Sequence, residues 1–267
     1  MTWRRTAAIV LRQAYLLRGS PARVIPLFAW VTVDIVLWGY ITRYLNSISS
    51  GGMNFVPVLL GAILFWDFFS RVMHGVATAF LEDVWSRNFL NIFASPLTIA
   101  EYLTGLVVTS VGTSLVGLAV MLLLAGTVFG LSFFIFGAQI LPFLFVLFLF
   151  GIAIGIFAIS VVLRFGPAGE WFVWPIPALL SPFAGVFYPI ATLPSWMRVI
   201  SYALPPSYIF ENMRALVLGR PASVPAALIG GVLAIVYVVA GCWTFARVHR
   251  QGVRSGLIAR YSAESVN

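Results

Sequence analysis

The apolar residues of this sequence are gathered into continuous runs of about 20 residues, and this feature limits the folds open to the chain. A helix needs about 20 such residues to cross ~30 Å of hydrocarbon. Backbone groups in lipid must be paired within their own segment, so long runs predict helices, whereas outer-membrane barrels show alternating segments of about 10 residues. Only 9% of the residues are charged. The sequence therefore predicts an all-α integral membrane protein.

Six membrane-spanning helices are expected, separated by polar or glycine-rich stretches. They cover approximately residues 24–43, 55–79, 99–126, 139–163, 171–190 and 225–246. The fifth contains prolines at positions 175, 177, 182 and 189, and each proline removes a helix hydrogen bond, so we expect a kinked or partly unwound span. The predicted organisation is an N-terminal amphipathic interfacial segment (1–23), a six-span transmembrane domain (24–246) and a cytoplasmic tail (247–267).

The basic residues are all arginine, and they lie beside the apolar runs. If both termini are cytoplasmic, 11 arginines fall on the inner side of the membrane and four on the outer side. Inner loops carry the excess of positive charge, so this count predicts a multi-pass protein with both ends in the cytoplasm. The net charge of +8 is then explained by membrane orientation. We expect the lipid bilayer, and no nucleic acid, as a partner.

Three further helical segments are expected outside the spans. In the first 20 residues, one face carries Trp3, Ala7, Val10, Ala14 and Leu17, with Arg5 and Arg12 opposite. This pattern suits a helix lying in the headgroup region, with a plain cytoplasmic helix as the alternative. Residues 82–94 form a short cytoplasmic amphipathic helix, which either caps the bundle or docks into the groove of a partner. Residues 193–220 form an external re-entrant or interfacial helical hairpin, because neither of its helical stretches reaches ~20 residues.

Charged residues within the second span are the sharpest candidates for a functional site. Asp67, Arg71 and His74 follow one another at steps of four and three, which places them on one helix face where Asp67 and Arg71 can pair. Charges at this depth usually face a bundle interior or an aqueous path. Two interpretations remain: the lining of a translocation path, or a structural ion pair. Asp34 is open to the same two, and Trp66 and Phe69 line a path or pack against lipid and protein.

Signatures of a catalytic or nucleotide-binding chain are missing from the sequence. Two histidines and one cysteine, Cys242, do not provide a metal cluster of these residues. A phosphate-binding loop of the G-x-x-x-x-G-K-[ST] type is impossible without lysine. We therefore expect no catalytic residue, metal or cofactor in this chain, and a separate energy source if it pumps. Of the alternative classes, a membrane-embedded enzyme has only the region of Glu211 and Arg214 as a candidate.

Motifs before the last span resemble those of the type-2 ATP-binding-cassette (ABC) exporter permeases. The family pattern is LP-x-W … P-x-x-Y-x-x-[DE]-x-x-R-x-x-x-x-G, and the matching stretches are Leu193-Pro194-Ser195-Trp196, Leu204-Pro205-Pro206-Ser207-Tyr208, Glu211, and Arg214 to Gly219. Ser95-Pro96-Leu97, with Glu101 and Gly105, is similar to the opening of the family's third span. Residues 82–94 fall where the family has its coupling helix. The resemblance covers nearly the whole chain.

This resemblance implies a permease subunit of the bacterial inner membrane that forms a homodimer and works with two separate ATPase subunits. Those subunits would bind ATP and magnesium and would dock on Glu82, Asp83, Trp85, Arg87, Asn88 and Phe89 of the coupling helix. The hairpin, with Trp196, Tyr208, Glu211 and Arg214, would shape the exit, and Asp67, Arg71, His74, Trp66 and Phe69 are candidates for the path. One departure is that the coupling segment is aromatic and asparagine-rich, where the family's is often strongly charged.

The cargo implied by the resemblance is a lipid, a lipid-linked or lipo-oligosaccharide, a polysaccharide or a hydrophobic drug. No residue selects among these. The competing hypothesis is a self-sufficient secondary transporter or channel that uses Asp67, Arg71 and His74 as a relay for protons or ions.

Overall fold

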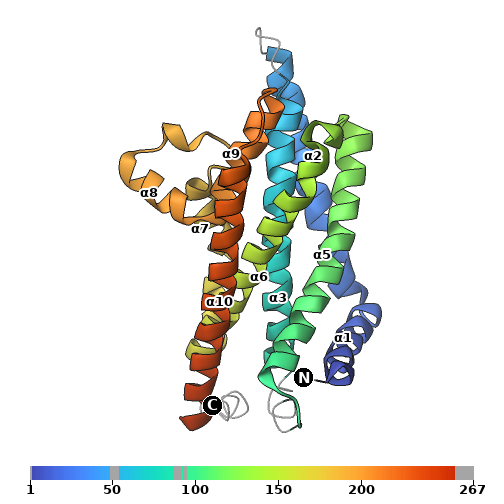
Figure 1. The fold of residues 1–267 in the computed structure, drawn as a ribbon. Helices are drawn as coiled ribbons and strands as arrows, with labels where there is room; N and C mark the ends of the chain where they lie inside the picture. Colours follow the sequence, from blue (N-terminus) through green and yellow to red (C-terminus); the bar gives the residue numbers. More distant parts are fainter. Residues whose placement is uncertain (1, 49–53, 87–91, 93–94, 256–267) are drawn as a thin grey trace.

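The computed structural model describes residues 2–48, 54–86, 92 and 95–255 and shows an elongated helical bundle (Figure 1). No strand occurs among these residues, so the all-α prediction is confirmed. Within them, five helices are long and apolar enough to cross a membrane. They are α2 (Pro21–Ile48), η1 with α3 (Val56–Leu60 and Gly61–Trp85), α5 (Ile99–Phe129), η2 with α6 (Phe133–Gln139 and Ile140–Phe165) and α10 (Val224–Arg254).

The fifth expected span, residues 171–190, is not a continuous helix. It holds the end of η3 (Pro167–Phe172), then α7 (Ile176–Ala184) and the start of η4 (Ile190–Thr192). The nine residues of α7 extend only ~14 Å, less than half of the hydrocarbon thickness. Pro175 precedes α7, and Gly185, in the left-handed conformation at φ +63°, follows it. The prediction of six membrane-spanning helices is therefore not confirmed.

The segment between α6 and α10 nevertheless runs from one end of the bundle to the other. η3 lies beside the C-terminal end of α3, where Glu170 accepts a hydrogen bond from Trp85. After α8 (Ser195–Ala203), α9 (Pro205–Val217) packs against η1 and η2, at the N-terminal ends of α3 and α6. The chain thus returns along the bundle in short pieces, and α7 and α8 project to one side (Figure 1).

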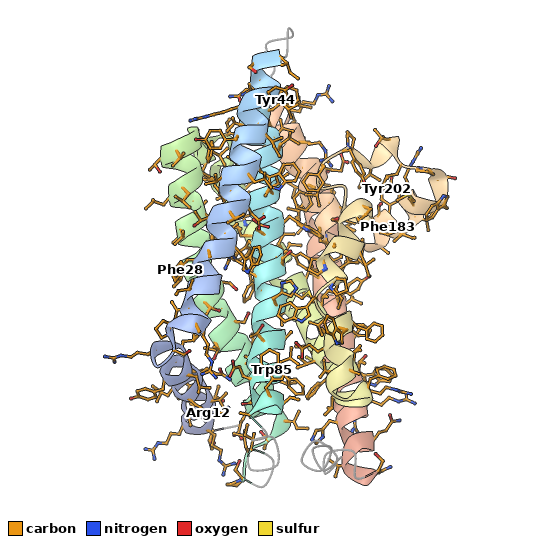
Figure 2. The ribbon with its side chains drawn as sticks, turned by 180° about the vertical axis from the view of Figure 1, so that it is seen from behind. Arg12, Phe28, Tyr44, Trp85, Phe183 and Tyr202 are labelled. Carbon is orange, nitrogen blue, oxygen red and sulfur yellow. The ribbon has the colours of Figure 1, made fainter. Side chains whose placement is uncertain are left out.

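The two ends of the bundle differ in what they carry. Helix α1 (Trp3–Arg18) lies at the end where α3 finishes, and Figure 2 shows Arg12 of α1 near Trp85 there, with Tyr44 of α2 at the opposite end. We call these the α1 end and the α9 end. The C-terminal end of α10 also lies at the α1 end (Figure 1).

Helices α3 and α6 form the centre of the bundle. In each, 72% of the most apolar stretch is buried, against 19%, 33% and 17% in α2, α5 and α10. Two glycines of α6 permit a close approach to α3. A β-carbon added at Gly151 would lie 2.9 Å from Val72 Cβ, and one at Gly155 would lie 2.9 Å from the carbonyl oxygen of Met73. Small residues at this spacing let helix backbones pack closely, and here they do so within one chain.

Helix α1 packs on α5 through a face that differs from the expected apolar one. Its buried residues are Thr6, Ile9 and Gln13, whereas Trp3 is 71% exposed. The reason is that polar partners on α3 and α5 fix the orientation of α1, and Gly105 of α5 leaves room for the Ile9 side chain. The spacing of apolar residues in the sequence does not predict such contacts between helices.

Candidate functional site

Two consecutive carboxylates at the end of α3 bind arginines of the N-terminal segment. Asp83, which is fully buried, forms an ion pair with Arg12 of α1 and accepts a hydrogen bond of 2.7 Å from the Tyr102 hydroxyl. Glu82 forms an ion pair of 2.9 Å with Arg23 of α2. We call the pairs Arg12–Asp83 and Arg23–Glu82 the α1 clamp. It fastens the junction of α1 and α2 to the central helix α3.

A third carboxylate adds to this attachment from α5. Glu101 lies in a capping box with Thr98, in which each side chain is bonded to the backbone N–H of the other residue. Glu101 also accepts a hydrogen bond of 2.6 Å from the backbone N–H of Thr2 and lies 3.7 Å from Arg5. The start of α5 and the start of α1 are therefore held by one buried carboxylate.

The clamp changes the expected role of the coupling residues. Asp83 lies inside the protein, so in this structure it does not face a partner subunit, and the Glu82 side chain is 16% exposed and paired with Arg23. Trp85 is 49% exposed, and its indole N–H donates a hydrogen bond of 2.9 Å to Glu170. Arg87, Asn88 and Phe89 lie outside the described residues. Of the docking candidates that the structure describes, Trp85 therefore offers the most accessible surface.

A cavity of about 590 Å³ lies between α1, α2, α3 and α5 and is bounded on one side by Trp174. Arg23 and Glu82 of the α1 clamp line one part of it, and Asp34, Asp67 and Arg71 line another. Glu82 and Asp67 are separated by ~22 Å along α3, so the cavity reaches from the α1 end deep into the bundle. We call it the polar cavity. Pockets that bind small ligands usually have volumes of about 300–1,000 Å³.

The three charged candidates of the second span all line the polar cavity, but Asp67 and Arg71 do not pair. No ion pair or hydrogen bond joins them in the part of the chain that the structure describes. The Arg71 guanidinium instead lies over α5, where a β-carbon at Gly117 would be 2.9 Å from Nη1. The expected ion pair is absent because the glycine provides space that the helical spacing of α3 does not reveal.

Four polar atoms that line the polar cavity are buried and have no hydrogen-bond partner among the described residues. They are Asp67 Oδ2, Arg71 Nε, His74 Nε2 and Ser114 Oγ. Buried polar atoms are normally paired, and each unpaired one carries a free-energy cost. Such atoms favour a polar molecule within the cavity. The ring of His74 also lies 5.2 Å from the ring of Trp174, a residue that the sequence analysis did not single out.

The two aromatic path candidates are placed elsewhere. Trp66 is 8% exposed and Phe69 is fully buried. Their rings pack against each other at 4.7 Å, and Phe69 stacks on Phe150 of α6 at 5.2 Å. Trp66 and Phe69 belong to the core face of α3, so they do not line the polar cavity. Trp30 of α2, one turn before Asp34, lines it instead.

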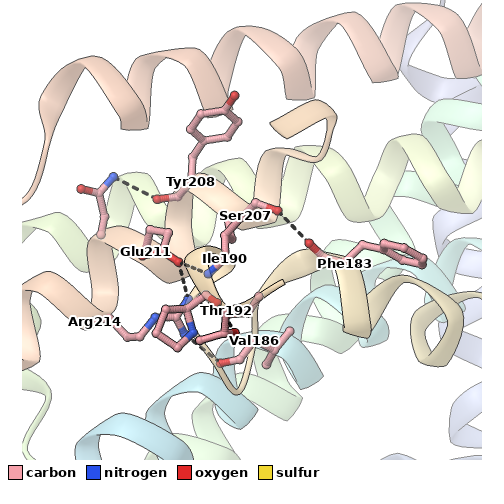
Figure 3. A network of polar contacts seen from close by, with 11 residues as sticks. Phe183, Val186, Ile190, Thr192, Ser207, Tyr208, Glu211 and Arg214 are labelled. Atoms are coloured by element: carbon pink, nitrogen blue, oxygen red, sulfur yellow. Dashed lines mark hydrogen bonds and ion pairs between the residues drawn. The ribbon is translucent and has the colours of Figure 1, made fainter. Parts of the chain in front are cut away.

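The predicted hairpin contains α8 and α9, and a network around Arg214 holds α9 against the end of α7 (Figure 3). Arg214 donates hydrogen bonds to the carbonyl oxygens of Gly185 and Val186, at 2.7 and 3.3 Å. It also forms an ion pair of 3.0 Å with Glu211, which accepts a hydrogen bond from the backbone N–H of Ile190. These contacts give both residues a structural role.

The two aromatic candidates of the hairpin differ in exposure. The Tyr208 hydroxyl donates a hydrogen bond of 2.8 Å to the carbonyl oxygen of Tyr202, which ties α9 to α8. Trp196 is 61% exposed. Its ring lies edge-on to Phe183 of α7, with ring centres 6.4 Å apart.

A comparison with sequence profiles of protein families gives a match over most of the chain. The sequence profile of a family described as ABC-2 type transporter matches residues 9–218, which is most of the chain. The match begins within α1 and ends just after α9, so it includes the α1 clamp and all the residues that line the polar cavity. No curated protein matches the chain.

Proposed function

From the premise that the chain belongs to the ABC-2 type transporter family, we propose that it is the transmembrane subunit of an ATP-driven exporter. The observation that carries this proposal is the family match over residues 9–218. The transport function of this family fits a chain with several helices that are long and apolar enough to cross a membrane. The polar cavity supports it, because a cavity within the bundle offers polar groups to a molecule that has left water.

The energy source in this proposal is a pair of separate ATPase subunits that bind ATP and magnesium. They dock at the α1 end, on Trp85 and the segment that follows it. A displacement there reaches the rest of the bundle through the α1 clamp, because Asp83 and Glu82 connect the last turn of α3 to Arg12 and Arg23. The clamp lines one end of the polar cavity through Arg23 and Glu82. The contacts of the α1 clamp thereby connect the proposed docking surface to the proposed cargo site.

The proposed assembly is a homodimer in a bacterial inner membrane, with the α1 end in the cytoplasm. The arginine distribution supports this orientation, since 11 of the 16 arginines then lie on the inner side. The placement of α1 and the end of α10 at the same end of the bundle is consistent with it (Figure 1). The proposed cargo is a lipid, a glycan linked to lipid, a polysaccharide or a hydrophobic drug.

Transport by inside-out vesicles tests this proposal. Vesicles that contain the chain and a co-expressed ABC ATPase are supplied with ATP and with three fluorescent cargoes: a phospholipid, a lipo-oligosaccharide and a lipophilic dye. We expect ATP-dependent uptake of at least one cargo, and loss of that uptake when the ATPase carries an inactive phosphate-binding loop.

A second candidate function has its own supporting observation. The unpartnered atoms of Asp67, Arg71 and His74 in one cavity also suit a relay for protons or ions. Uptake by the same vesicles without any ATPase, driven by a pH gradient, would favour this secondary transporter and contradict the exporter.

A further inference from the structure

The charges that line the polar cavity do not balance. Asp34 and Asp67 contribute two carboxylates and Arg71 contributes one guanidinium, while Arg23 and Glu82 neutralise each other in the α1 clamp. Among the described residues, no hydrogen bond or ion pair engages the side chains of Asp34, Asp67 or Arg71. The cavity therefore holds one carboxyl group more than the Arg71 guanidinium can neutralise. A cationic ligand would stabilise both carboxyl groups in their ionised form, so the site favours a ligand that carries a positive charge.

Two indole rings border the same space. Trp30 lies one helical turn before Asp34 on α2, and Trp174 approaches from the segment between η3 and α7, beside His74. The face of an indole ring attracts a cation within about 6 Å, and the attraction is stronger where water is excluded. Indoles also provide apolar area for the body of a ligand. Carboxylates next to indoles on separate elements are thus suited to a cation with an apolar body.

We propose that the polar cavity binds an amphiphilic organic monocation, with its positive group at Asp34 and Asp67 and its apolar body against Trp30 and Trp174. A sugar headgroup could use the unpaired atoms and stack on the indoles, but it would leave the extra carboxylate uncompensated. An anionic headgroup would add to the negative charge. As a statement about cargo, this inference rests on the proposed exporter function. As a statement about binding, it concerns this chain alone.

Binding of radiolabelled tetraphenylphosphonium to the full chain in lipid nanodiscs tests the inference. We expect saturable binding, weakened at least about tenfold by Asp34→Asn and by Asp67→Asn, because each removes one attracting charge in a medium of low dielectric constant. Arg71→Gln removes a repelling charge and should tighten binding several-fold. Glu211→Gln, a matched change at the α9 end, should leave it unchanged. A tighter variant and a weaker one together distinguish a charge effect from loss of folding.

Competitors with one octyl chain and different headgroups identify the preferred chemistry. Octyltrimethylammonium should displace the probe at lower concentration than octyl glucoside or octyl phosphate, each used below its micelle concentration. Preferential displacement by the glucoside would replace the cation with a glycan headgroup and overturn the inference. Equal binding in the wild-type chain and both aspartate variants would show only partition into lipid, and would also overturn it.

The outcomes separate this inference from the proposed function. ATP-driven uptake of another cargo without cation binding would refute the inference and leave the exporter standing. Cation binding without ATP-driven uptake would support the inference and contradict the exporter function.

Discussion

Replacing Arg12 with methionine removes the charged partner of a fully buried carboxylate while keeping the length and apolar stem of the side chain. Asp83 would then retain the hydrogen bond from Tyr102 and lose its ion pair. Breaking a buried pair costs about 3–5 kcal/mol, and an exposed pair is worth at most about 1 kcal/mol. The Arg12 side chain is 26% exposed and Tyr102 remains in place, so we expect about 2 kcal/mol for detachment of α1.

Accessibility of a cysteine at position 9 measures this detachment. Ile9 is 8% exposed and packs on Gly105, so Ile9→Cys in a Cys242→Ser background reacts with a maleimide only when α1 leaves α5. A change of about 2 kcal/mol raises the open fraction roughly 30-fold, and the labelling rate rises with it when opening and closing are fast.

Arg5→Met is the matched control. Arg5 lies 3.7 Å from Glu101 and is 43% exposed, and Glu101 keeps its bonds from Thr2 and Thr98. We expect at most about a fivefold increase in labelling, which corresponds to about 1 kcal/mol. Adding Asp83→Asn to Arg12→Met should reverse part of the increase, since the buried charge is then removed. If Arg12→Met labels no faster than Arg5→Met, the clamp does not hold α1 and the reasoning is wrong.

Three other changes test separate parts of the account. Gly155→Val should lower the melting temperature of the purified chain, because a β-carbon there would meet the Met73 carbonyl and Val76, whereas Gly231→Ala, whose nearest contact is 3.8 Å away, should not. Arg214→Gln should cost about 2 kcal/mol by breaking the bonds to Gly185 and Val186, seen as faster hydrogen exchange in α7 and α9; equal exchange in Arg214→Gln and the exposed control Arg220→Gln would count against the network. Trp85→Ala should reduce co-purification of the ATPase severalfold, and Trp196→Ala, an exposed tryptophan on α8, should not; the reverse order would contradict docking at Trp85.

The long helices were predictable because each membrane-spanning helix corresponds to a continuous apolar run in the sequence. The break in the fifth expected span was only partly predictable. Its prolines indicated a distorted helix, but the left-handed Gly185 and the bonds from Arg214 that fix the chain after α7 depend on contacts across 28 and 29 residues. Sequence spacing does not report contacts of that kind.

The residues on α3 show what helical spacing predicts and what it does not. Asp67, Arg71 and His74 share a face and line one cavity, as expected from their positions. Trp66 and Phe69 were grouped with them, although their register places them on the core side of the same helix. Packing against protein was one of the two roles expected for these residues.

Two other features could not be read from local sequence. The burial of Asp83 depends on Arg12, 71 residues earlier in the chain. The absence of an Asp67–Arg71 pair depends on the space above Gly117. Both involve residues brought together only by the packing of the helices.

Photo-crosslinking from position 85 tests the central claim most directly, namely that a separate ATPase acts on the α1 end of this chain. A photoreactive phenylalanine analogue replaces Trp85, or the exposed Trp196 of α8 as a control, and adducts formed in native membranes are identified by mass spectrometry. The account predicts an ABC ATPase in the adduct from position 85 and none from position 196. Adducts with lipid alone from position 85, in membranes where the ATPase is present, would contradict it.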